Sequence, residues 1–259
     1  MYKIYPKTLF IGQKVQYLPS CHSTNDEAAD LIANALVEEG IVVVTDHQTA
    51  GRGQRGNQWD AEPGQNLTFS LVVRPVFLAA AEQFWLNMAV SLGIIDALEP
   101  LAGAELHIKW PNDIYIDNQK LGGLLIENTV QGYTLAWSVI GIGLNVNQTT
   151  FAHPAATSLQ ARFPLPTGYD LRELLTTILE SIERRYLQLR TGGRASGNRD
   201  TIRASYLQRL FRYQEEHFFR AEGTLFKGII IGVDDTGRLA IQAKAGVRYF
   251  GFKEVEFMV

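Results

Sequence analysis

The 259-residue sequence has little of what marks several classes of protein. Its single cysteine, Cys21, cannot form an intramolecular disulfide, so an oxidising compartment offers the chain no benefit. The formal net charge is −3 and like charges form no long block, unlike a dedicated nucleic-acid binder. The apolar runs are shorter than the roughly 20 residues that a bilayer requires, and the N-terminus lacks the apolar core of a signal peptide. We therefore expect a soluble, cytoplasmic protein that binds neither DNA nor membranes.

The rest of the composition, with 46% apolar and 20% charged residues, is that of an ordinary globular protein. A capping-box pattern at Thr24–Glu27 opens a helix that we expect to continue to Gly40. Helical spacing predicts further helices at residues 79–98, 171–189 and 202–211. Short β-branched or alternating runs predict strands at residues 41–45, 67–73, 106–110, 114–116, 121–127 and 133–142. The later connections are too short for parallel crossovers, so residues 1–211 read as an α+β domain with antiparallel pairing.

From Arg212 onward the pattern changes to short strands alone. Strands are predicted at residues 225–233, 239–243 and 247–252, with a turn at residues 234–237. This is enough chain for a small barrel-like β domain at residues 212–259.

The segment Gly51-Arg52-Gly53-Gln54-Arg55-Gly56 follows a predicted strand. Glycines there let backbone N–H groups approach an anion, and arginines add positive charge. The dinucleotide-binding version of this pattern must open a helix within a βαβ unit, and residues 57–64 do not look helical, so we reject that interpretation. On the string alone, an anion-binding loop and a flexible surface loop are equally good interpretations.

Two further segments combine glycines with polar side chains. Lys109, Asn112 and Asp113 crowd around a proline at a strand break, and Lys120 precedes paired glycines in an apolar strand. Asn112 and Asp113 could simply form a turn, and Lys120 could be a solvated strand end.

In the strand that follows, Gly141 and Gly143 alternate, which would leave one face bare. The two interpretations are the floor of a ligand pocket, and a bulge or tight packing under a helix.

Four segments occur in one order: residues 23–25, 48–53, 109–120 and 141–145. Together they resemble the biotin–protein ligase family (biotin–[acetyl-CoA-carboxylase] ligases), over roughly residues 15–150. The resemblance implies a mixed sheet with helices, related to class II aminoacyl-tRNA synthetases, and a small C-terminal SH3-like domain. It also implies an enzyme that makes biotinyl-5′-AMP from biotin and MgATP. The biotin is then transferred to a lysine of a biotin carboxyl carrier protein.

The resemblance also implies roles for individual residues. Lys120, Arg52 and Asp113 would be catalytic, and Asp113 is also the candidate Mg²⁺ ligand. The biotin-binding set would comprise Ser23, Thr24, Asn25, Gln48, Gly51, Arg52, Gly53, Gln54, Lys120, Gly123 and Gly141. The ATP- and adenylate-binding set would comprise Arg52, Arg55, Trp59, Lys109, Asn112, Asp113, Lys120 and Asn145.

The sequence departs from the family pattern in two places. Gln54 stands where many relatives carry an arginine that helps to retain the adenylate, and Arg55 is the candidate to replace it. The catalytic segment begins within the first twenty residues, so we expect a monofunctional ligase without the N-terminal DNA-binding domain of bifunctional members.

Two alternative functions stay open. A lipoate– or octanoate–protein ligase shares the fold, although its usual Gly-Gly-Gly run is not found here. A non-catalytic biotin sensor would be marked by loss of Lys120 or Arg52, and both are present. The oligomeric state, monomer or homodimer, is also open.

Overall fold

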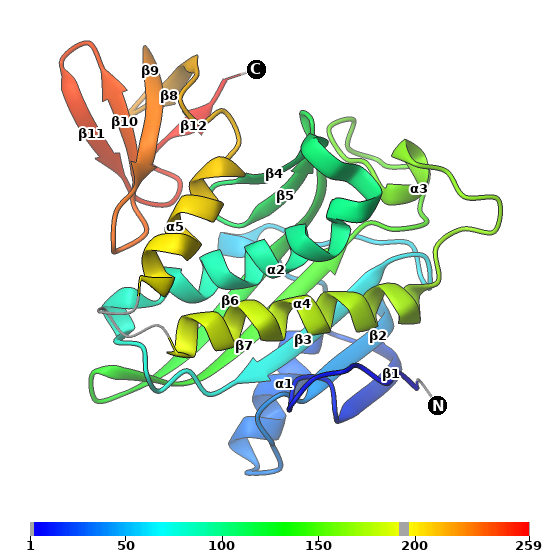
Figure 1. Cartoon of the computed structure of the whole chain (residues 1–259). Helices are drawn as coiled ribbons and strands as arrows, with labels where there is room; N and C mark the ends of the chain where they lie inside the picture. The colour runs from blue at the N-terminus through cyan, green and yellow to red at the C-terminus, as the bar shows by residue number, and fades with distance from the viewer. Residues whose placement is uncertain (1–2, 192–196, 259) are drawn as a thin grey trace.

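The computed structural model describes residues 3–191 and 197–258. A seven-stranded mixed sheet, in the order β1-β2-β3-β7-β6-β5-β4, forms the centre of the chain (Figure 1). Its strands are β1 Val15–Cys21, β2 Val42–Gln48, β3 Leu67–Val73, β4 Leu106–Lys109, β5 Asp113–Ile116, β6 Gln119–Gln131 and β7 Thr134–Leu144. β1 and β2 pair in parallel, and the other neighbours pair antiparallel.

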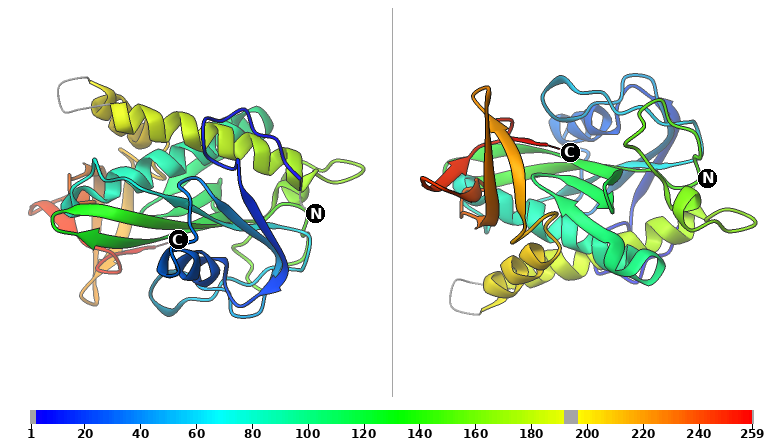
Figure 2. Two further views of the ribbon diagram at one scale, coloured as in Figure 1. Left: turned by 90° about the horizontal axis from the view of Figure 1, so that it is seen from below. Right: turned by 90° about the horizontal axis from the view of Figure 1, so that it is seen from above.

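The two faces of this sheet are covered differently (Figures 1 and 2). Three helices cover one face: α2 Phe84–Ala102, α4 Leu171–Thr191 and α5 Asn198–Gln208. The single helix α1, Thr24–Ala33, packs on the other face. Along β3, Phe69 and Leu71 point into the large core beneath α2 and α4, whereas Val72 joins the small cluster beneath α1. Because α1 is short, the sheet beside it stays free to line a cavity.

Short helical turns connect these elements. They are η1 Gln54–Gly56, η2 Ala80–Glu82, η3 Gly103–Glu105 and α3 Leu159–Arg162. η1 lies in the glycine-rich segment, so part of this segment has regular local structure.

The C-terminal part forms a second, five-stranded sheet in the order β11-β10-β9-β8-β12. Its strands are β8 Glu216–Ala221, β9 Thr224–Val233, β10 Leu239–Ala243, β11 Gly246–Phe250 and β12 Glu256–Phe257. Trp110 joins it to the large sheet, because its indole Nε1 donates to the carbonyl of Gly237 at 2.9 Å. Gly237, at φ +89°, also packs directly against the ring of Phe84.

Several expectations about elements need correction. The first helix ends at Ala33 instead of continuing to Gly40, and Ala35 then adopts a φ of 55°. Ser23 precedes this helix, and no side-chain capping bond forms there, so the capping-box prediction was wrong. β1 and β8 were not predicted, because their alternation of apolar and polar residues is weak.

The apolar-run argument also needs a correction. Residues Ala80–Ala102 form a helical stretch of 23 residues that is long and apolar enough to cross a membrane by composition. Within the fold, 72% of its apolar window is buried, as in the core helix of a soluble protein.

Candidate active site

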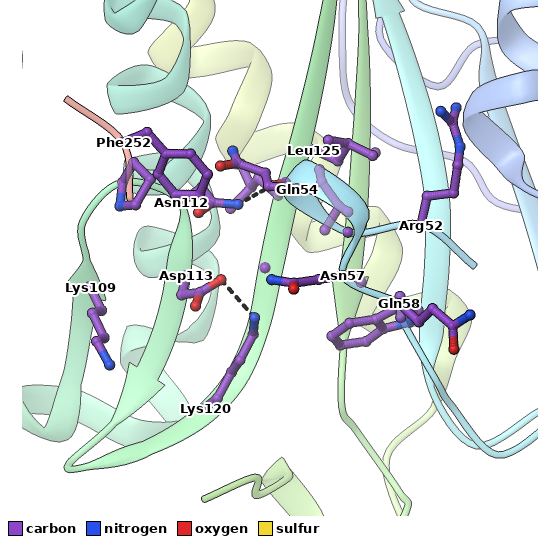
Figure 3. A pocket seen from close by; sticks show the side chains of 18 of the residues that line it. Arg52, Gln54, Asn57, Gln58, Lys109, Asn112, Asp113, Lys120, Leu125 and Phe252 are labelled. Carbon is purple, nitrogen blue, oxygen red and sulfur yellow. Dashed lines mark hydrogen bonds and ion pairs between the residues drawn. The ribbon is translucent and has the colours of Figure 1, made fainter. Parts of the chain in front are cut away.

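A cavity of about 380 Å³ opens on the face of the sheet that carries α1 (Figure 3). Segments far apart in the sequence line it: the start of α1, the glycine-rich segment, the ends of β5 to β7 and residues 252–257. Most of the expected site residues meet here. They are Ser23, Thr24, Asn25, Gln48, Arg52, Gly53, Gln54, Trp59, Lys109, Asn112, Asp113, Lys120, Gly123 and Gly141.

Glycines on two neighbouring strands form the floor of the cavity. A side chain at Gly141 would collide with the amide of Asn25, and one at Gly143 would collide with the ring of Trp59. Ile140 and Ile142, which alternate with them, point into the core on the opposite face. The bare strand face inferred from the sequence is therefore in close contact with Asn25, at the start of α1, and with Trp59, and both of these side chains also line the cavity.

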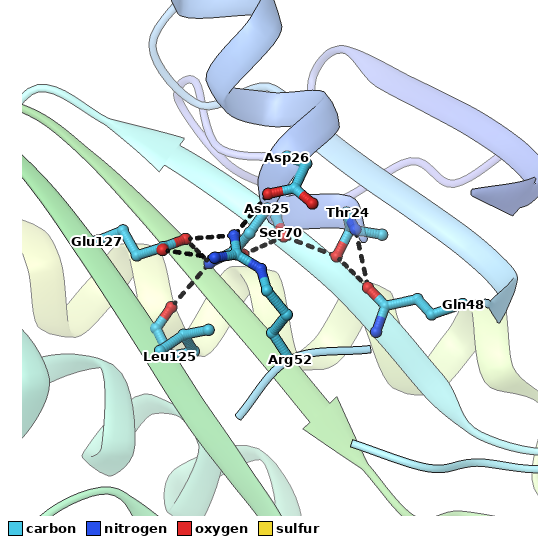
Figure 4. Close-up of polar contacts among 8 residues, drawn as sticks. All are labelled: Thr24, Asn25, Asp26, Gln48, Arg52, Ser70, Leu125 and Glu127. Atoms are coloured by element: carbon cyan, nitrogen blue, oxygen red, sulfur yellow. Dashed lines mark hydrogen bonds and ion pairs between the residues drawn. The ribbon is translucent and has the colours of Figure 1, made fainter. Parts of the chain in front are cut away.

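One end of the cavity is a buried wall of hydrogen-bonding groups (Figure 4). The backbone N–H and hydroxyl of Thr24 donate to Oε1 of Gln48 at 2.8 and 3.2 Å. The hydroxyl of Ser70 lies 2.7 Å from that of Thr24 and 2.6 Å from Oδ1 of Asn25. Thr24 and Asn25 are each 3% exposed. A fixed buried set of donors and acceptors suits a compact, neutral polar ligand group.

Ser70 was missed by the sequence interpretation. The signal was present, since Thr68 and Ser70 alternate in a β3 strand whose other residues are all apolar. Both polar residues therefore face the side of the sheet that carries the cavity.

The other end of the cavity carries an ion pair. Nζ of Lys120 lies 2.8 Å from Oδ1 of Asp113, and both side chains are partly exposed. The pairing of β5 with β6 slips by one residue at Leu121, so this extra residue turns Lys120 onto the same face as Gly123. A side chain at position 123 would lie 2.9 Å from Oδ1 of Asp113, so glycine leaves room for the pair.

Lys109 stands beside this ion pair in an aromatic environment. Its Nζ donates to the hydroxyl of Tyr115 at 3.1 Å and lies 5.5 Å from the ring of Phe257. Burial lowers the pKa of Lys109 and raises the pKa of Tyr115 to about 12. Phe257 belongs to β12, so the C-terminal sheet contributes to this end of the site.

Arg52 does not meet Lys120 in this structure. Its guanidinium binds Asp26 on α1 and Glu127 on β6, and its side chain points away from the Lys120 ion pair (Figures 3 and 4). Asp26 and Glu127, like Ser70, were missed by the sequence interpretation.

Two of the expected residues, Gly51 and Asn145, are not among the residues that line the cavity. Gly51 packs against the backbone carbonyl of Trp59. Asn145 is buried, and its Nδ2 donates to the carbonyl of Thr157 at 3.0 Å. The side chain of Arg55 lies outside the described residues.

Two buried polar atoms at or near the site have no protein partner within the described part of the chain. These are Nε1 of Trp59, whose ring covers Gly143, and Oδ1 of Asn145. A buried donor without a partner costs free energy, and a bound molecule can supply the missing acceptor. The indole of Trp59 is therefore placed to donate to a ligand in the cavity.

Among the described residues, no group of three or more His, Cys, Asp or Glu side chains could hold a metal ion. Asp113 alone would give an incoming Mg²⁺ one protein carboxylate. That donor set fits Mg²⁺ bound mainly through the phosphates of a nucleotide, which is how the ion is usually held in such sites.

Residues 17–145 match the Biotin/lipoate A/B protein ligase family. The biotin–[acetyl-CoA-carboxylase] ligase of Paracoccus denitrificans is 34% identical over 247 residues, covering 91% of this chain and 97% of that protein. The bifunctional ligase/repressor BirA of Bacillus subtilis is 31% identical over 256 residues, covering 96% of this chain and 76% of that protein.

Solved structures share the fold. A biotin protein ligase from Aquifex aeolicus, in complex with biotin and ATP, superposes with a TM-score of 0.77 at 23% identity. The match covers 95% of this chain and 99% of that chain. The mixed α+β architecture, including the C-terminal β-sheet part, is thus that of biotin protein ligases.

Proposed function

The chain belongs to the biotin/lipoate A/B protein ligase family, and from that premise we propose that it is an ATP-dependent biotin–[acetyl-CoA-carboxylase] ligase. One observation carries the proposal: a single cavity joins a buried hydrogen-bonding wall to a cationic end. Thr24 and Gln48 belong to the wall, and Lys120 belongs to the cationic end. Biotin has a neutral, polar ureido ring at one end and a carboxylate at the other, so it complements both.

In the first step, the carboxylate of biotin attacks the α-phosphorus of ATP, a mixed anhydride forms and pyrophosphate leaves. Two anions must meet, so a cation directed at both lowers the barrier by electrostatic preorganisation. We assign this role to Lys120, whose ammonium Asp113 holds over the cavity floor.

In the second step, the ε-amine of a lysine on the acceptor attacks the acyl carbon of the anhydride. An amide bond forms, the C–O bond to the phosphate breaks and AMP leaves with the oxygen. Asp113 is the carboxylate proposed to position the incoming amine. The acceptor that we propose is the biotin carboxyl carrier protein or domain of a biotin-dependent carboxylase.

ATP and Mg²⁺ fit the remaining part of the site. Lys109, Asn112 and Trp59 also line the cavity, and they offer charge, an amide and an aromatic face. We propose that they hold the nucleotide, and that Asp113 supplies the single protein ligand of Mg²⁺.

The domain arrangement that we propose is a catalytic domain at residues 1–211 and an SH3-like domain at residues 212–259. The five antiparallel strands of the second sheet support the latter. The net charge and the single cysteine support a cytoplasmic protein without DNA or membrane partners.

Lipoate or octanoate is the second candidate substrate, because the family includes lipoate ligases. These acids lack a ureido group, so they offer no hydrogen-bonding partner to the wall that Thr24, Gln48 and Ser70 form. A site built for hydrogen bonds rejects such analogues strongly. The wall therefore favours biotin.

The test is to incubate the purified protein with MgATP, a biotin carboxyl carrier domain and either biotin or lipoate, and to read the mass of the carrier. A gain of one biotin, with none from lipoate, is the expected result. A mass gain from lipoate alone would overturn the assignment of biotin as the substrate. No gain from either acid, together with tight biotin binding, would favour a biotin sensor.

A further inference from the structure

A single carboxylate, that of Glu127 on β6, joins two walls of the cavity (Figure 4). Its Oε2 accepts from Nδ2 of Asn25, at the start of α1, at 2.7 Å. Its two oxygens also accept from the guanidinium of Arg52, in the glycine-rich segment, at 3.2 and 3.1 Å. Asp26 on α1 accepts from the same guanidinium at 2.6 Å. Helix, glycine-rich segment and sheet are therefore tied together at one corner of the cavity.

Glu127 and the backbone carbonyl of Leu125 together set which way the amide of Asn25 faces, because Nδ2 of Asn25 donates to both, at 2.7 and 3.3 Å. Oδ1 of Asn25 accepts from Ser70 at 2.6 Å, while its Nδ2 donates to Glu127. A flipped amide would place its oxygen against the carboxylate, which cannot donate a hydrogen bond when ionised. The amide rests directly on Gly141, so its orientation sets the hydrogen-bonding surface at the cavity floor.

We propose, on the basis of the biotin ligase function proposed above, that Glu127 is a positioning residue for biotin. It acts through Asn25 and Arg52, which it holds so that α1 and the glycine-rich segment form one rigid wall. The side chain of Arg52 then links the glycine-rich segment to α1 and β6. In this role it does not act as a second cation on the reacting anions, which differs from the catalytic role expected for it from the sequence.

The conservative variant Glu127→Gln isolates this role. Glutamine has nearly the same shape, but it offers one acceptor oxygen and a donor NH₂ in place of two acceptor oxygens. Its oxygen can accept from Asn25 or from Arg52. Its NH₂ group then faces the other of these two residues, which is also a donor. Loss of a partner that orients a ligand-binding side chain costs on the order of tenfold or more at metal sites. We expect a similar rise of roughly tenfold in the Kd for biotin.

The experiment is calorimetric titration of biotin without ATP, followed by the rate of pyrophosphate release at saturating biotin and ATP. Glu127→Gln is expected to raise the Kd while leaving the saturated rate close to wild type. Glu38→Gln, in the exposed pair with Lys14, is the matched control and is expected to change neither quantity. An unchanged Kd, or a faster saturated rate, would overturn the proposal. A wild-type protein that neither binds biotin nor releases pyrophosphate would instead refute the proposed function itself.

Two further variants test this link through Arg52. Asp26→Asn removes one negative charge beside Arg52 and keeps an acceptor oxygen, so it is expected to raise the Kd less than Glu127→Gln does. Arg52 and Glu127 act as one unit in this proposal. The double variant Arg52→Gln/Glu127→Gln is therefore expected to bind biotin no more weakly than the weaker-binding of the two single variants. Independent losses of affinity, which would multiply in the double variant, would contradict a shared role.

Discussion

The ammonium of Lys120 lies 2.8 Å from Oδ1 of Asp113, above a glycine at position 123 that leaves room for both side chains. The one-residue slip at Leu121 makes this arrangement possible, because without it Lys120 and Gly123 would lie on opposite faces of β6. A local irregularity in one strand thus presents the cation to the cavity.

Replacement of Lys120 by alanine is expected to slow adenylate formation by roughly 100- to 1,000-fold, because a preorganised charge at the reacting centre is lost. ATP-dependent synthesis of biotinyl-AMP measures this rate. Lys227→Ala, in the exposed ion pair with Glu216 on the C-terminal sheet, serves as the control and should keep the wild-type rate. Wild-type synthesis by the Lys120 variant would remove the basis for the assigned mechanism.

A methyl group added at Gly141 is expected to weaken biotin binding. The new Cβ would collide with the amide of Asn25 and push it out of the wall, and a buried hydrogen bond that the ligand then loses costs about 1–3 kcal/mol. At 1.4 kcal/mol for each factor of ten, the affinity should fall roughly tenfold to a hundredfold. Calorimetric titration with biotin checks this. Gly232→Ala on β9, where the methyl group would meet no atom within 4 Å, should bind biotin as wild type does.

Most of the site could be predicted from the sequence, because the residues of each segment are adjacent in the chain. Lys120 and the alternating glycines Gly141 and Gly143 carry that information directly. Asp26 and Glu127 could not be placed in the same way. They meet Arg52 only because the fold packs α1 and β6 beside the glycine-rich segment. The partners of the Arg52 side chain could not be predicted for the same reason, since they lie 26 and 75 residues away in the sequence.

Among the elements, the long strands and helices were predicted well and the edges poorly. β3 has all its residues buried, and its bounds match the predicted ones. β1 is an edge strand with mixed burial, and nothing in its composition distinguishes it from a loop. α1 ends at Ala33, where the sequence has neither a glycine nor a proline. Its end could therefore not be predicted from the residue types that usually terminate helices.

Gln54→Arg is expected to slow the release of biotinyl-AMP. Gln54 lines the cavity, and an arginine there would add a charge-assisted hydrogen bond to the phosphate, worth about 1.5–3 kcal/mol. Release should therefore slow by roughly tenfold or more. A chase of preformed adenylate with excess biotin and pyrophosphatase measures the release rate. Gln242→Arg, on the exposed side of β10, is the control for added charge. Equal release from wild type and Gln54→Arg would show that this position does not contact the phosphate.

Two buried tyrosines offer a matched test of what holds the core together. The hydroxyl of Tyr206 is fully buried without a hydrogen-bond partner in the described part of the chain, whereas that of Tyr186 donates to Glu39 at 3.0 Å. Removal of a buried polar group that has no partner removes a desolvation cost of about 1–3 kcal/mol. Tyr206→Phe is therefore expected to raise the free energy of unfolding by about 1 kcal/mol.

Tyr186→Phe removes a satisfied hydrogen bond and leaves an acceptor oxygen of Glu39 without that donor, so it is expected to lower the free energy of unfolding by about 1 kcal/mol. Urea denaturation of both variants and the wild type gives the two differences with their signs. If Tyr206→Phe were instead destabilised as much as Tyr186→Phe, the hydroxyl of Tyr206 would have to be bonded, and a buried water would be the partner to look for. Each variant loses one oxygen atom. Opposite signs of the two stability changes would therefore show that the stability of this core depends on whether the hydroxyl is hydrogen-bonded.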